Sequence, residues 1–252
     1  MALTSCVPTA RRFAHLLVPL IAAITVSLGG GTAAAWADAP ASGPGASAQP
    51  IAGDGRPGPL LGEVRRELSL ARHTRYQHTT EVNEQTGTFD YDCSGFVDYA
   101  LRRVDPAAYR ALPVSTTRPL AQDIVNQIRG ATHSAKAGPW HQVPTVRELR
   151  PGDLLSWLTP RDSDSDNTGH VMVVLATPTR SPRAGNEWLV RVADSTMSPH
   201  ADDTRIGGSP TGLGTGTIGL VTDSSGRPSA YYWRGGLSTK LQRTVIALGR
   251  IG

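Results

Sequence analysis

The stretch DCSGFVDYALRRVDP, residues 92–106, predicts a helix that begins directly after a polar residue and carries a cysteine in its first turn. Its apolar residues recur at helical spacing and form one stripe: Phe96, Val97, Ala100, Leu101 and Val104. Asp92 is a residue type that caps helix N-termini, and Pro106 ends the helix because the residue before a proline avoids helical geometry. We therefore expect a helix over 93–104 with one buried face.

Two further helices are predicted on either side of this one. Upstream, apolar residues recur at helical spacing with charged residues between them: Leu61, Val64, Leu68 and Ala71. Downstream, the stretch from Pro119 to Arg129 has a proline at its start and Gly130 as its stop. Residues 73–91 are polar, and we expect a loop there.

After Pro144 the pattern changes from helical to extended. Strand-like runs separated by turn residues cover 154–158, 170–176, 188–194, 217–222 and 230–233, the last two as a hairpin. We interpret the run Gly212–Gly216 as a turn entering a strand, because it lacks the strand before it and the helix after it that a phosphate-binding loop needs. Helices followed by an antiparallel sheet predict an α+β domain, with the N-terminal helices packed on the sheet.

The N-terminus has the order of a secretory signal peptide: Arg11 and Arg12, an apolar stretch over 13–28, and small residues up to Ala37. The apolar stretch is shorter than the roughly 20 residues of a membrane span, so we expect cleavage after Ala37 and no stable membrane span afterwards. The export route, general secretory or twin-arginine, stays open. Residues 38–59, rich in Pro, Gly, Ala and Ser, predict a flexible linker, and 60–252 are expected to form one extracytoplasmic domain.

This cleavage leaves a single cysteine. It removes two arginines and no acidic residue, so the formal charge falls from +4 to +2 (4 minus 2), which gives no indication of nucleic-acid binding; we expect a monomer. It also removes Cys6 and leaves Cys93 unpaired in a compartment where cysteines normally form disulfides. An unpaired cysteine is either an inert core thiol or a reactive one. The N–H groups at a helix start favour a thiolate, so the position of Cys93 favours a nucleophile.

A thiol nucleophile needs a base, and only His170 among the histidines left after cleavage opens a strongly apolar strand. If the following strand pairs with 177 opposite 187, Asp194 falls opposite His170, where Cβ atoms lie about 4.5–5.5 Å apart. Asp194 would then orient the imidazole. Alternatively, Asp194 caps the turn after its strand. No ligand spacing indicates a metal site.

Three motifs resemble those of the NlpC-type cell-wall cysteine peptidases. They are the run from Asp92 through Cys93 to Val97, the run 149–154, and Gly169-His170-Val171 with its apolar strand. The resemblance implies a papain-like NlpC-type fold and cleavage of amide bonds in the peptide stems of peptidoglycan, with no cofactor. It further implies Cys93 as the nucleophile, His170 as the base and, one strand later, Asp194 as the third polar residue. Whether another polar residue, such as His200, takes this third place stays open.

Other residues near these motifs are candidate binding groups. Tyr76 resembles a tyrosine that lines the family's site, and Asp92 and Ser94 are candidates for substrate binding or for the oxyanion site. Two other functions stay open. One is another thiol acyl-transfer enzyme, such as an N-acetylmuramoyl-L-alanine amidase or a transpeptidase. The other is a non-catalytic wall-binding module.

Overall fold

The computed structural model describes residues 58–133, 138–205 and 211–252. The predicted signal peptide and nearly all of the predicted linker therefore lie outside the described residues. Helix α1 spans Pro59–Leu70 and begins at a proline, so the last residue assigned to the linker is the first residue of a helix. No helix in the described ranges is long and apolar enough to cross a membrane.

The cysteine-bearing helix forms as the sequence predicts. Helix α2 spans Cys93–Val104, and Oδ1 of Asp92 accepts a hydrogen bond from the N–H of Gly95 at 2.7 Å. Helix α4, Ala121–Gly130, begins two residues after the predicted Pro119 and contains the glycine expected to stop it. A short helix that the sequence did not reveal, α3 (Pro106–Arg110), follows α2, because Pro106 both ends one helix and starts the next.

A large antiparallel sheet makes up the second half of the chain. Its order is β11-β10-β9-β8-β6-β5-β12-β4, with β7 paired to β8. The bounds are β4 Trp140–Gln142, β5 Leu154–Leu158, β6 Gly169–Val174, β7 Thr179–Arg180, β8 Glu187–Thr196, β9 Gly212–Thr222, β10 Pro228–Tyr232, β11 Gln242–Arg243 and β12 Ile246–Ile251. Single 3₁₀ turns cover Val146–Glu148 and Gly235–Leu237. The prediction of an α+β domain is confirmed.

Two local predictions are wrong. The expected loop over 73–91 contains a small sheet of β1 (His73–Arg75), β2 (Glu81–Asn83) and β3 (Thr88–Asp90), with β3 in the middle. It forms because Phe89 is fully buried in the core and anchors β3. The run Gly212–Gly216 is part of β9 itself and pairs along β8, so it is not a turn.

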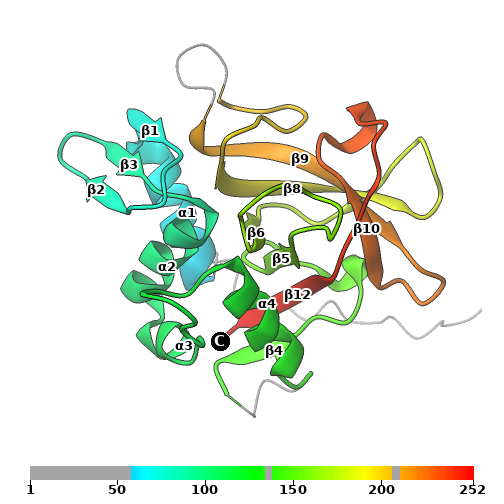
Figure 1. Cartoon of the computed structure of the whole chain (residues 1–252), viewed down its shortest axis with the longest axis horizontal. Coiled ribbons are helices and arrows are strands. Elements are labelled where there is room, and N and C mark those ends of the chain that lie inside the picture. Colours follow the sequence, from blue (N-terminus) through cyan, green and yellow to red (C-terminus); the bar gives the residue numbers. More distant parts are fainter. Residues whose placement is uncertain (1–57, 134–137, 206–210) are drawn as a thin grey trace, which may run out of the picture. The chain divides into compact units, whose positions relative to one another are not determined.

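The core has two parts, one on each face of the central strand β6. Val171 and Val173 pack with the helices, whereas Met172 and Val174 pack in a second cluster on the opposite face. Helices α1, α2 and α3 gather at one side of the sheet (Figure 1). Because both faces are covered, β6 is the buried central strand that its apolar sequence predicts.

Candidate functional site

His170 and Asp194 meet, although in a different register from the predicted one. Strands β6 and β8 pair Val173 with Ala193 and Val174 with Val192, two residues away from the expected pairing, because β7 forms within the connection and adds its own pairing to β8. A shift of two residues keeps every side chain on its face. His170 Nε2 therefore still lies 2.6 Å from Asp194 Oδ2.

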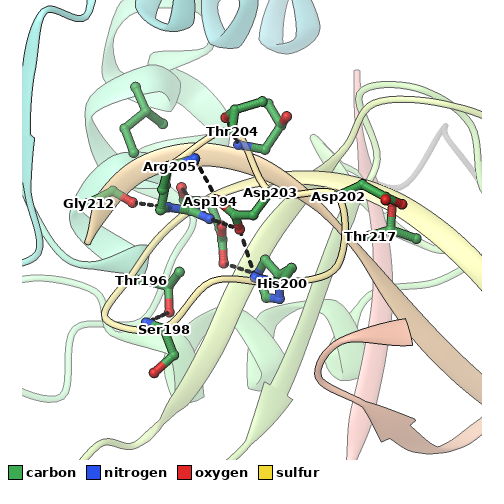
Figure 2. A network of polar contacts seen from close by, with 12 residues as sticks. Asp194, Thr196, Ser198, His200, Asp202, Asp203, Thr204, Arg205, Gly212 and Thr217 are labelled. Carbon is green, nitrogen blue, oxygen red and sulfur yellow. Dashed lines mark hydrogen bonds and ion pairs between the residues drawn. The ribbon is translucent and has the colours of Figure 1, made fainter. Parts of the chain in front are cut away.

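Asp194 is fully buried and also contacts two cationic side chains. His200 Nε2 lies 2.9 Å from the same Oδ2, and the guanidinium of Arg205 contacts Oδ1. Figure 2 shows Asp194 between Arg205 and His200. Burial alone would raise the pKa of Asp194, but the charge of His200, the hydrogen bonds from both histidines and the charge of Arg205 hold it well below its usual range. Asp194 is therefore an ionised carboxylate that only accepts hydrogen bonds.

His170, Asp194 and His200 place three ligand atoms within 4.8 Å of one another, a spacing that could hold a metal ion. However, both imidazoles donate an Nε2–H to the carboxylate, and the guanidinium of Arg205 already occupies its other oxygen. A metal ion needs unprotonated nitrogens and would be repelled by Arg205. The chemistry of these donors suits a hydrogen-bonded ion network better than a metal centre.

Cys93 lies where β8 separates from β6. The N–H of Val174 bonds to Asp153 on the β5 side, so by alternation the N–H of Val171 points toward β8, where the β6–β8 pairing begins only at Val173. This N–H donates a hydrogen bond to the sulfur of Cys93. The sulfur is thus held against the residue that follows His170. Within the described ranges, no hydrogen bond joins Cys93 to His170.

The expectation of a resting thiolate at Cys93 is wrong. The residue is only 4% exposed. Burial raises the pKa of its thiol above the ordinary value, and the charge of Asp92 raises it further, while the N–H group of Val171 lowers it. Burial and the neighbouring carboxylates thus disfavour a negative sulfur more than the N–H groups at the helix start favour it. The resting sulfur is a thiol.

Asp92 and Ser94 flank the cysteine and are linked by an arginine that the sequence did not single out. Arg118 donates to Asp92 Oδ2 at 2.5 Å and to Ser94 Oγ at 2.8 Å. Ser94 also donates to Asp92 Oδ1 at 3.0 Å, and His78 Nδ1 lies 3.1 Å from Oδ2. The side chains proposed for substrate or oxyanion contacts are thus engaged in fixing the start of α2. Arg118 lies in a loop with no periodicity, so no sequence signal marked it.

Cys93 and His170 open onto adjoining hollows. One, of about 310 Å³, is lined by Cys93, His78 and Arg118; the other, of about 330 Å³, is lined by His170 and by aromatic side chains. Both are lined by Tyr76 and Gly169. Gly169 has φ +157°, and a Cβ there would lie 2.0 Å from the carbonyl oxygen of Trp157, so only glycine fits at this shared wall.

The predicted residue Tyr76 lies at this junction. Burial raises the pKa of its hydroxyl, and the charge of Asp92 raises it further, which keeps the hydroxyl protonated as a hydrogen-bond donor. The aromatic side chains of the second hollow are in part packed together, since Trp157 stacks on Tyr231 with ring centroids 4.0 Å apart.

No family model matches this chain, and no match was found among the curated proteins or the solved structures.

Proposed function

We propose that this chain is an exported thiol-dependent hydrolase that cleaves amide bonds in the peptide stems of peptidoglycan. The observation that carries the proposal is the position of the buried Cys93 thiol, which lies at the start of α2 and against Val171 of β6. The residue before Val171 is His170, whose imidazole is held by an ionised carboxylate. The motifs around Cys93 and His170, which resemble those of NlpC-type peptidases with their papain-like fold, support the substrate class.

The base follows from the tautomer of His170. Since Nε2 carries the proton donated to Asp194, the neutral imidazole has its lone pair on Nδ1. On substrate binding, the sulfur of Cys93 turns from the Val171 N–H toward Nδ1 and transfers its proton there. The thiolate is thus generated for the attack and is not stored at rest, which agrees with the raised pKa of the buried thiol.

The reaction then takes two steps. The thiolate forms a C–S bond with the amide carbonyl, and the N–H groups at the start of α2 stabilise the oxyanion. The intermediate collapses by breaking the C–N bond, and the imidazolium of His170 protonates the departing amine. Water, deprotonated by His170, hydrolyses the thioester to a carboxylic acid and restores the thiol. Asp194 orients His170 throughout, and in this proposal the Tyr76 hydroxyl binds the carbonyl side of the substrate.

Digestion of purified peptidoglycan tests this proposal. The purified protein and its Cys93→Ala variant are incubated with the same wall preparation, and the soluble fragments are weighed by mass spectrometry. We expect new amino and carboxyl termini within the peptide stems, in the wild-type sample only. Equal products from both samples would refute a role for the thiol. Wall binding without products from either would favour a binding module, and a cut between sugar and peptide would identify an amidase.

A further inference from the structure

We propose that His200 and Arg205 are positioning residues that hold Asp194 from the side opposite His170 and, by offsetting its charge, limit how strongly Asp194 favours the protonated form of the His170 imidazole. This inference rests on the proposed role of His170. His200 and Arg205 themselves lie in none of the sequence motifs of the proposed site.

The hydrogen bonds of His200 define its charge. Nε2 lies 2.9 Å from the carboxylate of Asp194, and Nδ1 lies 2.9 Å from the carbonyl oxygen of Trp233. Both oxygens only accept hydrogen bonds, so both ring nitrogens carry protons and the ring is an imidazolium. The side chain is fully buried. Burial lowers the pKa of His200, but Asp194 and the Trp233 carbonyl outweigh it and raise the pKa above its usual value.

Arg205 completes a balanced set of buried charges. Its guanidinium contacts Asp194 Oδ1, donates to Asp203 Oδ2 at 2.6 Å and donates to the carbonyl of Gly212 at 2.6 Å. Asp203 Oδ2 also accepts the backbone N–H of His200 at 2.7 Å. Two carboxylates thus face two cations, and the attraction between these opposite charges offsets the desolvation cost of burying all four.

Alternating glycines of β9 leave the room in which these two cationic side chains pack against the strand. A Cβ at Gly214 would lie 2.6 Å from Arg205 Cγ, and one at Gly216 would lie 2.4 Å from His200 Cβ, closer than atoms can pack. The segment that carries both cations also pairs with β9 beside these glycines, through Ala201 and Thr217. The glycine run 212–216 therefore serves to let His200 and Arg205 lie directly on the strand (Figure 2).

The charges of His200 and Arg205 affect His170 through the carboxylate of Asp194, which all three residues contact. A lone buried carboxylate beside an imidazole would strongly favour its protonated form. Here the same oxygen, Oδ2, serves both histidines, and its charge is already offset by His200 and Arg205. The groups facing His200 are Asp194 from β8, His170 from β6, Asp203 and Arg205 from its own segment, and the Trp233 carbonyl after β10. Loss of the His200 charge should therefore favour protonation of His170.

Nuclear magnetic resonance of the ¹⁵N-histidine-labelled protein tests the inference without substrate. In the wild type we expect both ring nitrogens of His200 to stay protonated at pH 7, and an unprotonated nitrogen there would overturn the proposal. In His200→Gln, which keeps a donor but removes the charge, the titration midpoint of His170 should rise by about one pH unit. An unchanged or lower midpoint would also overturn it.

The exposed His133 offers a matched control, since His133→Gln removes a histidine elsewhere and should leave the midpoint unchanged. Because the readout is a titration and not hydrolysis, this inference and the proposed function can fail separately. If Cys93→Ala still digests the wall while His200 remains charged and the midpoint shifts, the function is wrong and the network is right.

Discussion

Arg118 controls the charge beside the thiol, and replacing it tests how the site is held together. The side chain is 18% exposed and joins the two residues that flank Cys93, Asp92 and Ser94. Arg118→Met removes four hydrogen bonds, which the guanidinium donates to Asp92 Oδ2, to Ser94 Oγ and to the backbone carbonyls of His78 and Pro119. Because the side chain is partly exposed, we take about 1.5 kcal/mol for the bond to the carboxylate and about 0.5 kcal/mol for each of the others, so we expect the free energy of unfolding to fall by about 3 kcal/mol. For a domain of this size that lowers Tm by about 6–12 °C.

The same change should slow the chemistry of the thiol. The charge of Asp92 raises the pKa of Cys93, and without Arg118 the exposed His78 is, among the described residues, the one basic side chain still paired with that carboxylate. A rise of one further pKa unit reduces the thiolate fraction about tenfold. The assay is the rate of iodoacetamide alkylation at fixed pH in a Cys6→Ser background, where Cys93 is the sole thiol. The exposed Arg129, changed to Met, is the control. Equal or faster alkylation in Arg118→Met would refute this account.

Three further changes test the buried charges and the packing around them. Asp194→Asn leaves buried cations uncompensated and should lower the free energy of unfolding, measured in urea, by about 3–5 kcal/mol. Because the pKa of Asp194 in the folded protein is depressed, this advantage of the wild type should shrink as the pH falls below about 4. An advantage that stays constant down to pH 2 would contradict this. Gly216→Ala should lower the free energy of unfolding by about 1–3 kcal/mol, whereas Gly236→Ala, where a Cβ meets open space, should leave it unchanged. Equal melting temperatures of the two variants would contradict the role of Gly216 in making room for His200. Burial raises the pKa of Glu67 to about 8, so the contribution of its protonated form to the free energy of unfolding is complete below about pH 4.5 and lost as the pH rises through 8. Glu67→Gln should therefore flatten the fall in Tm between pH 5 and pH 8. An unchanged pH dependence of Tm would count against a buried, protonated Glu67.

The local elements with strong periodicity were predictable, and those that depend on partners were not. Helix α2 begins and ends where the spacing of its apolar residues, its Asp92 cap and Pro106 place it. Strand β5 matches its predicted bounds, 154–158. In contrast, β12 lies between β5 and β4, although its sequence carries no strong strand signal. The small sheet over 73–90 was also missed, because its three-residue strands are too short to show a period and are held by burial of Phe89.

The candidate site, too, was predictable from the sequence only in part. The sequence alone determined that one cysteine stands at a capped helix start, and that His170 and Asp194 share a face, because alternation along a strand is a local property that a register shift of two cannot change. Only the tertiary structure decided that the resting sulfur is a thiol, that Arg118 joins both neighbours of Cys93, and that His200 and Arg205 hold Asp194. The physical reason is that burial and charge pairing depend on which segments meet in space, and spacing along the chain does not record that.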